Sequence, residues 1–195
     1  MHPNEGKRIE ALKLSNLLDT QAEAKFDFIT NDASKICGCS IALISLIDED
    51  RQWFKSKIGL DLSETKRDVS FCSHAILQDD IFEIPNARED ERFCNNPLVV
   101  GDPQIRFYAG APIIWNGLPL GTLCVIDKKS KKLSFEQRFA LKLFAHQIAE
   151  VITLRNIMLE NQKKMLILNQ EKNELRHRQL KVIGDVKSIK KQFME

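Results

Sequence analysis

The chain has 195 residues, 43% of them hydrophobic and 29% charged, and its formal net charge is +2. These proportions are typical of a soluble globular protein with one domain and an appended segment. No apolar run approaches the roughly 18 residues that a membrane span requires, and the first residues have no apolar core of a secretory signal. We therefore expect a cytoplasmic protein without a membrane partner.

In chain order, the first elements are predicted to be two helices and a strand hairpin. Apolar residues at nearly helical spacing predict helices over 8–18 and 26–36, the second ending near Gly38. Residues 41–47 are almost all apolar, which predicts a central strand covered on both faces. Residues 51–58 alternate and are predicted to return as its hairpin partner.

A second hairpin is predicted over 105–115 and 118–127, because Asn116-Gly117 between them is the strongest short hairpin signal in the chain. A two-residue turn at Asn116-Gly117 would pair Trp115 with Leu118, and each residue before Trp115 with the residue equally far beyond Leu118. The pairs would then include Ala111 with Thr122, Ala109 with Cys124 and Phe107 with Ile126. We expect all six side chains on the sheet face that packs against helices.

The opposite face of this hairpin carries Tyr108, Gly110 and Gly121. Two glycines there remove side chains, which predicts space for a ligand or a loop to approach the backbone. Tyr108 is the only tyrosine, and its place on this face makes it the leading candidate for a polar aromatic side chain in a pocket.

From Ser134 the pattern becomes helical, and Ser134 with Gln137 forms a predicted capping box at the helix start. Apolar residues then recur in steps of three and four from 151 to 193, which is typical of a coiled-coil seam. Asn161, Lys172 and Gln179 interrupt the seam. Its apolar positions are Val151, Leu154, Met158, Met165, Leu168, Leu175, Val182, Val186, Ile189 and Phe193. A stripe this long has no partner within the chain, so we predict a parallel homodimer.

Residues 155–195 carry ten Lys or Arg against five Asp or Glu. A basic segment can indicate nucleic-acid binding. Here the basic residues interleave with acidic ones at helical spacing, which favours a solvated helix surface. We predict no nucleic-acid partner.

Cys72 and His74 follow Ser70, an expected N-cap, and are predicted to open a short helix over the sheet. The dipole of a helix start favours a thiolate, so Cys72 is a candidate ligand-facing thiol, although packing as a small buried residue is favoured. His74 is equally well a polar group in an apolar pocket or a side chain bonded to local backbone.

A polar connection follows, with Asp90, Arg92 and Phe93. Arg92 could clamp a carboxylate or phosphate, oriented by Asp90. The alternative is a structural Asp–Arg pair that fixes the loop over the pocket, which we favour slightly.

The five cysteines, Cys37, Cys39, Cys72, Cys94 and Cys124, are expected to stay thiols in a reducing compartment. Zinc sites need paired Cys or His at set spacing, which neither Cys37-Gly38-Cys39 nor Cys72-Ser73-His74 has. We predict no metal and no cofactor.

Several separated stretches resemble the GAF domain, in the bacterial branch found before histidine kinases and cyclic-di-GMP enzymes. They include Phe71-Cys72-Ser73-His74, Asp90-Glu91-Arg92-Phe93, Asn96-Pro97-Leu98-Val99 and Gly121 to Asp127, and the resemblance covers roughly 8–155. It implies an α+β fold: a central antiparallel sheet of about six strands, with helices on one face and loops with a short helix over the other. We expect a GAF domain over 1–150 and a coiled-coil signalling helix over 151–195.

The resemblance implies a non-enzymatic sensory module that binds an unknown small molecule and signals through the coiled coil to a kinase or cyclic-di-GMP effector. The expected ligand-binding residues are Tyr108, His74, Arg92, Cys72, Asp90, Phe93, Gly110 and Gly121. One alternative is a ligand-free dimerisation scaffold. A second is a redox enzyme similar to free methionine-R-sulfoxide reductase, with Cys72 and Cys94 as its thiols, although Ala109-Gly110-Ala111-Pro112 departs from that enzyme's acidic motif.

Overall fold

The computed structural model describes residues 1–192, with side chains as far as Gly184. Its contacts divide it into two compact units, Met1–Thr153 and Leu154–Glu195. Among the described residues, no helix has the length and hydrophobicity needed to cross a bilayer.

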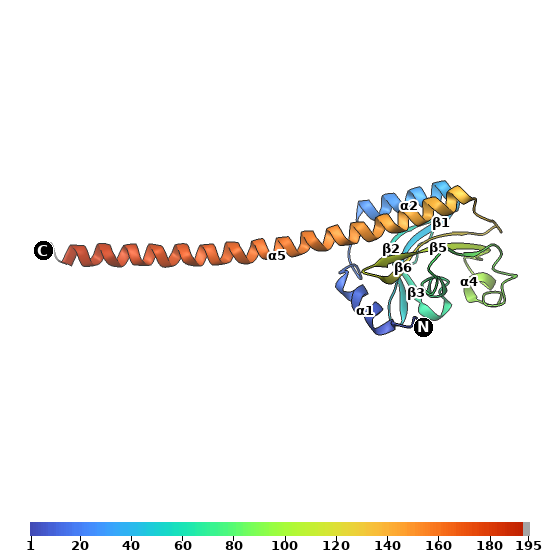
Figure 1. Ribbon diagram of the computed structural model, residues 1–195, viewed down its shortest axis with the longest axis horizontal. Helices are drawn as coiled ribbons and strands as arrows, with labels where there is room; N and C mark the ends of the chain where they lie inside the picture. The colour runs from blue at the N-terminus through green and yellow to red at the C-terminus, as the bar shows by residue number, and fades with distance from the viewer. Residues whose placement is uncertain (193–195) are drawn as a thin grey trace. The chain divides into compact units, whose positions relative to one another are not determined.

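A six-stranded antiparallel sheet forms the centre of the first unit, in the order β3-β2-β1-β6-β5-β4 (Figure 1). This confirms the predicted α+β fold. The strands are β1 (Ile41–Ile47), β2 (Arg51–Ile58), β3 (Glu64–Lys66), β4 (Phe82–Ile84), β5 (Phe107–Trp115) and β6 (Leu118–Asp127).

Both predicted hairpins form. Every residue of β1 is buried, and β1 lies between β2 and β6, as its continuous apolar run predicts. At the β5–β6 turn, Asn116 and Gly117 have φ angles of 51° and 75°. A two-residue hairpin turn requires these left-handed conformations to match the twist of the two strands that it joins.

The predicted register of the β5–β6 hairpin is wrong beyond its tip. Trp115 pairs with Leu118 as expected, but a bulge at Ile113/Ile114 shifts the pairing, so that Ala111 lies opposite Leu123 rather than Thr122. A one-residue shift moves side chains to the other face of a sheet. Cys124 and Ile126 therefore lie on the same face of the sheet as Tyr108, not against the helices.

α2 (Ala24–Cys37) and the first part of α5 (Phe135–Gln192) cover one face of the sheet (Figure 1). α1 (Glu5–Leu14) adds Ala11 and Leu12 to the same hydrophobic cluster. α2 ends at Gly38, whose φ of 60° gives the left-handed cap expected of a glycine. The predicted capping box at the start of α5 is confirmed, because the Ser134 N–H donates to Gln137 Oε1 at 3.0 Å and the Gln137 N–H to Ser134 Oγ at 3.2 Å. α1 begins and ends earlier than the predicted 8–18.

The other face is covered by a 3₁₀ turn (Arg67–Val69), α3 (Cys72–Ala75), α4 (Pro97–Val100) and the connecting loops. We call the side chains between these segments and the sheet the loop-covered layer. All of the residues proposed from the sequence as ligand-binding, except Gly121, lie in or at the edge of this layer.

In the second unit, α5 is helical from Leu154 as far as the structure describes it. Apolar side chains along it are exposed, including Leu154, Met158 and Leu168. The seam positions Val186, Ile189 and Phe193 lie outside the residues with described side chains.

Candidate functional site

Stacked aromatic side chains fill the loop-covered layer. The Phe71 and Phe93 rings are parallel with centroids 4.0 Å apart, and Tyr108 stacks on Phe71 at 5.2 Å. The Phe82 ring completes the cluster, with its centroid 6.2 Å from that of Phe93 and 6.1 Å from that of Tyr108. Phe93 and Tyr108 are 1% and 0% exposed, so this cluster is interior packing rather than the wall of an open pocket.

Tyr108 occupies the space that Gly110 leaves on β5. A Cβ built at Gly110 would overlap the Tyr108 hydroxyl and come 2.8 Å from its Cζ. The glycine is therefore required, as the sequence indicates, but by the protein's own tyrosine and not by a ligand. The space that the sequence analysis expected for a ligand at Gly110 is therefore filled by Tyr108.

Gly121 allows a close approach of a neighbouring strand, and not of a ligand or loop as predicted. A Cβ there would overlap the backbone carbonyl of Ser45 and come 2.8 Å from the Leu46 Cα. The neighbouring strand β1 approaches β6 so closely that only glycine fits. Gly121 thus contributes to strand packing, and no free space adjoins it.

His74 and Arg92 lie at the rim of the aromatic cluster. The imidazole of His74 is half-buried and meets Phe93 edge-on at 4.9 Å. Burial lowers the pKa of His74, and the nearby positive charge of Arg92 lowers it further. The Arg92 guanidinium lies over the Phe82 ring at 4.9 Å and near Phe93 at 5.5 Å, as cation–π contacts.

Asp90 holds Arg92 in this position. The guanidinium donates to both carboxylate oxygens, from Nε to Oδ1 at 2.9 Å and from a terminal nitrogen to Oδ2 at 2.6 Å. These hydrogen bonds lower the pKa of Asp90. The backbone carbonyl of Asp90 also accepts from Phe93 and Cys94. The pair therefore fixes the loop over the aromatic cluster, which is the structural role that the sequence favoured.

Cys72 is the first residue of α3, and its sulfur lies 3.7 Å from that of Cys124 on β6. The Tyr108 hydroxyl donates to Cys72 Sγ at 3.3 Å. The expected helix start is partly confirmed, since Ser70 Oγ accepts from the backbone N–H of Ser73 at 3.2 Å. Sequence reasoning missed Cys124 because the β-bulge moved it to this face.

Cavities in the loop-covered layer are small. A void of about 30 Å³ lies among apolar side chains of β1, β2 and the α4 region. A larger cleft of about 480 Å³ opens beside α3 and is lined by Met1, Glu49, Asp50, Lys66, Arg67, Asp68, Ser73, His74 and Leu77. Of the candidate ligand residues, His74 alone lines this cleft.

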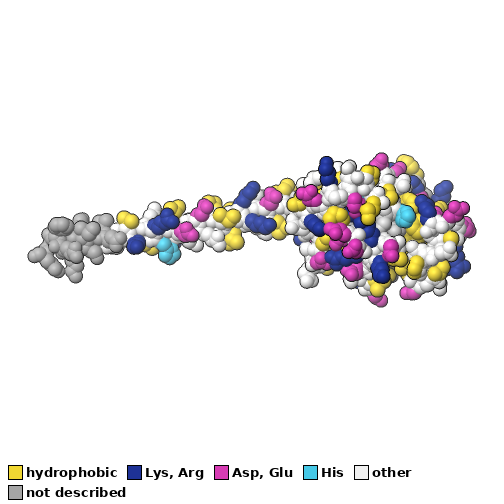
Figure 2. Space-filling model, turned by 90° about the horizontal axis from the view of Figure 1, so that it is seen from below, with side chains coloured by type: hydrophobic (Ala, Val, Ile, Leu, Met, Phe, Trp, Pro, Cys, Tyr) yellow, Lys and Arg dark blue, Asp and Glu magenta, His cyan; other side chains and the backbone are white. Residues whose placement is uncertain are grey.

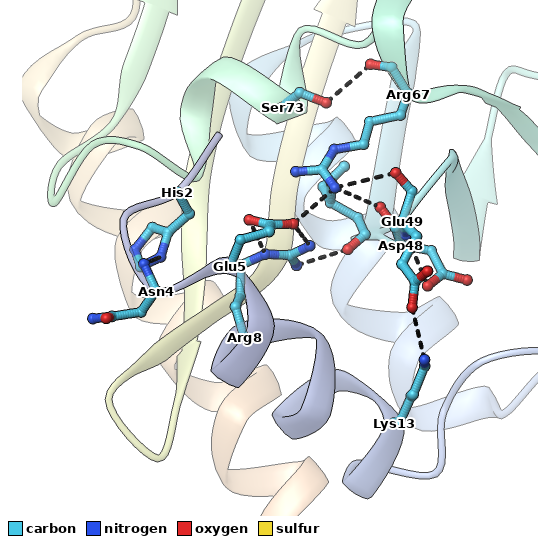
Figure 3. A network of polar contacts seen from close by, with 10 residues as sticks. His2, Asn4, Glu5, Arg8, Lys13, Asp48, Glu49, Arg67 and Ser73 are labelled. Carbon is cyan, nitrogen blue, oxygen red and sulfur yellow. Dashed lines mark hydrogen bonds and ion pairs between the residues drawn. The ribbon is translucent and has the colours of Figure 1, made fainter.

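A network of charged side chains borders the cleft and attaches α1 to the sheet (Figure 3). The Arg8 side chain is fully buried and donates to the Ile47 carbonyl at 2.7 Å and to Glu5 at 2.7 and 3.1 Å. Glu5 also pairs with Arg67 at 2.8 Å. Arg67 in turn donates to the Asp48 carbonyl at 2.9 Å and its own carbonyl accepts from Ser73 at 3.0 Å. The sequence analysis did not identify this network.

Within the described residues, no group of three or more His, Cys, Asp or Glu side chains is placed to hold a metal ion.

Comparison with known proteins places this arrangement in one family. The GAF domain model matches residues 21–152. A cyclic di-GMP phosphodiesterase of Pseudomonas aeruginosa is 46% identical over 143 residues, which cover 72% of this chain but only 24% of that protein. The chain thus spans about a quarter of the length of that relative.

Solved structures share the fold at low sequence identity. The GAF domain of a Coxiella burnetii phosphoenolpyruvate-protein phosphotransferase superposes with a TM-score of 0.59 at 14% identity, over 80% of this chain and 96% of that one. The corresponding Acinetobacter domain gives 0.58 at 18% identity, over 78% and 95%. With most of its length matched by the family and its sheet, helices and covering loops in the same arrangement, the chain belongs to the GAF domain family.

Proposed function

We propose that this protein is a non-enzymatic regulatory GAF module that dimerises through a parallel coiled coil of α5 and signals through it to an effector. In this proposal residues 1–150 form the regulatory domain and 151–195 the signalling helix. The observation that carries it is the exposure of apolar side chains along α5. Leu154, Met158, Met165, Leu168, Leu175 and Val182 are each between 57% and 61% exposed.

These side chains repeat every three and four residues, which is the spacing at which one helix covers another. Figure 2 shows hydrophobic side chains distributed along the described part of α5 between charged ones. Contiguous apolar surface of this extent is rarely left to solvent. A second copy in register would bury it symmetrically, and a parallel pair would bring the two C-termini together where an effector follows.

The effector is proposed from the resemblance and the comparison. A relative that shares 46% identity over this region is a cyclic di-GMP phosphodiesterase much longer than this chain. We therefore favour an effector that makes or degrades cyclic di-GMP over a histidine kinase. The cytoplasm is the compartment in which such an effector would act.

The dimer is tested by sedimentation with matched variants. Changing Leu168 and Leu175 to Lys puts charges into the seam, whereas changing Leu166 and Leu180 to Lys alters side chains that are 62% and 59% exposed but lie beside it. The seam variant should sediment as a monomer with an unchanged circular dichroism spectrum of the folded domain, and the second variant as a dimer. A dimer that survives the seam charges, or one lost equally in both variants, would contradict the coiled coil.

Small-molecule binding is the second candidate function, with the cleft beside His74 as the observation that favours it. The aromatic packing around Tyr108 favours a domain that transmits its signal without a bound ligand. Native mass spectrometry of the purified protein distinguishes the two. A co-purified molecule, released on changing His74 to Ala, supports ligand binding, and a bare dimer mass supports the scaffold.

Catalysis as a methionine sulfoxide reductase is disfavoured by the position of the thiols. The sulfur that adjoins Cys72 belongs to Cys124 on β6 and not to Cys94. Measurable reduction of free methionine sulfoxide that is abolished by Cys94→Ala would overturn the non-enzymatic proposal.

A further inference from the structure

Five polar side chains are buried together in the otherwise apolar loop-covered layer: Ser45, Cys72, Tyr108, Thr122 and Cys124. None is more than 2% exposed. They come from β1, α3, β5 and β6, so the chain brings them together from four separate segments. Ser45 and Thr122 lie opposite each other on adjacent strands. Polar groups are costly to bury unless they are hydrogen-bonded, so such a group of them calls for an explanation.

Two of the three hydroxyls in this group have no hydrogen-bond partner among the described residues. Ser45 Oγ and Thr122 Oγ1 are buried and make no hydrogen bond to any described side chain or backbone group. Both belong to the same buried group as Cys72 and favour its charged form. A neutral thiol is a weak acceptor, whereas a thiolate accepts several O–H donors. The surroundings of Cys72 therefore suit a thiolate better than a thiol.

The Cys72 thiol is more acidic than the Cys124 thiol, and a reactive pair requires such a difference. Burial raises the pKa of Cys72, but the neighbouring Cys124 thiol and the Thr122, Tyr108 and Ser45 hydroxyls together outweigh it and lower that pKa. The pKa of Cys124 is raised, first by its contact with the Cys72 sulfur and then by its burial. Cys72 is thus the nucleophile of the pair and Cys124 the proton-bearing neighbour.

The other three cysteines lack this arrangement. Burial raises the pKa of Cys37 to about 12 and that of Cys39 to about 11. Cys94 is half-buried in a loop, with the Glu91 carbonyl 3.8 Å from its sulfur. Among the described cysteines, only Cys72 and Cys124 combine sulfur contact with a set of surrounding hydroxyl donors.

We propose that Cys72 and Cys124 form a peroxide-sensitive dithiol that closes to an intramolecular disulfide. The Cys72 thiolate attacks one oxygen of hydrogen peroxide, the O–O bond breaks, and the departing hydroxide takes up a proton to leave as water. The resulting sulfenic acid is then attacked by the Cys124 sulfur, which displaces the second oxygen as water. In sum, two thiols and one peroxide give one disulfide and two waters.

Closing the bond requires small movements. A disulfide is about 2.05 Å long, so the two sulfurs must approach from 3.7 Å by about 0.8 Å each. Peroxide must first reach a buried sulfur, and Cys72 belongs to α3, a single helical turn of four residues. Once formed, the disulfide would fasten α3, which also carries His74, to the strand β6 in the centre of the sheet.

Mass spectrometry of the full chain tests this directly. The purified protein is treated with hydrogen peroxide until Cys94 is oxidised, its remaining thiols are alkylated, and it is digested with trypsin without reduction. Cleavage after Arg67, Arg88, Arg106 and Lys128 places Cys72 and Cys124 in separate peptides with one cysteine each. We expect these two peptides joined, with the loss of two hydrogens, and Cys37 and Cys39 recovered as alkylated thiols.

Two variants separate this chemistry from incidental oxidation. Tyr108→Phe removes one donor to the Cys72 thiolate and should slow formation of the cross-link about tenfold. Cys94→Ala should leave it unchanged. The proposal is overturned if Cys72 and Cys124 are both recovered as alkylated thiols once Cys94 is oxidised, or if either is joined to a different cysteine.

Discussion

Replacing Arg8 by methionine removes the charge that attaches α1 to the sheet while keeping a long side chain of similar reach. The wild-type guanidinium is fully buried and makes three hydrogen bonds, one to the Ile47 carbonyl and two to Glu5. Removing one partner from a buried ion pair costs about 3–5 kcal/mol because the other charge is left unpaired. Glu5 keeps Arg67 as a partner, so we expect the lower end of that range, about 3 kcal/mol.

Urea denaturation measures this loss. Trp53 and Trp115 both lie in the first unit, so tryptophan fluorescence reports its unfolding and not that of the second. With a slope of about 2 kcal/mol per molar urea, the midpoint should fall by about 1.5 M. The matched control is Lys13→Met. Lys13 and Glu49 form an ion pair whose side chains are 61% and 59% exposed, so its loss should change the stability little.

A double variant identifies the source of the effect. If the penalty arises from an unpaired Glu5, then Glu5→Gln combined with Arg8→Met should cost less than the sum of the two single changes. The reasoning is refuted if Arg8→Met lowers the stability no more than Lys13→Met does. Strictly additive single changes would instead assign the loss to the Ile47 carbonyl.

Three further outcomes are expected. Gly121→Ala should cost about 2 kcal/mol in urea unfolding because its Cβ would collide with β1, whereas Gly6→Ala, with nothing within 4 Å, should not destabilise. Ser134→Ala should cost about 1 kcal/mol through loss of the capping box, with Ser134→Asp restoring most of it. Burial raises the pKa of Glu5, but hydrogen bonds from Arg8 and Arg67 lower it to about 2. Its contribution to stability is therefore complete above about pH 4.3 and lost as the pH falls toward 2, so parent and Glu5→Gln should converge in acid.

The sequence predicted those parts of the fold that depend on local signals. The apolar run of β1, the Asn116-Gly117 turn and the Ser134 capping box each depend on residues within a few positions of one another, and each is confirmed. The glycine at 110 was also recognised as significant, but as a place that leaves space for a ligand or a loop. What the local pattern could not reveal is that Tyr108, two residues away, turns its own hydroxyl into that space.

The candidate site was harder to predict because it depends on register and on distant pairs. One extra residue in β6 opposite Ile113 moves Cys124 from the helix-covered face to the loop-covered layer. Pro112 cannot donate to the ladder and so indicates an edge or a bulge near this point, but it does not determine the register. The ion pair of Glu5 with Arg67 joins residues far apart in the chain, where spacing gives no information. Asp90 and Arg92 are close in sequence, and there the structural role that was favoured matches the geometry.

The strand order has a consequence for how the chain acquires its fold. β1 and β6 are neighbours in the sheet, yet β1 ends at Ile47 and β6 begins at Leu118. During synthesis the β1–β2 hairpin therefore emerges with the inner edge of an almost entirely apolar strand unpaired until β6 has been made. Such an edge can pair with other chains, and late long-range contacts slow folding. The interval between the two hairpins is thus the stage at which this protein most needs protection from aggregation.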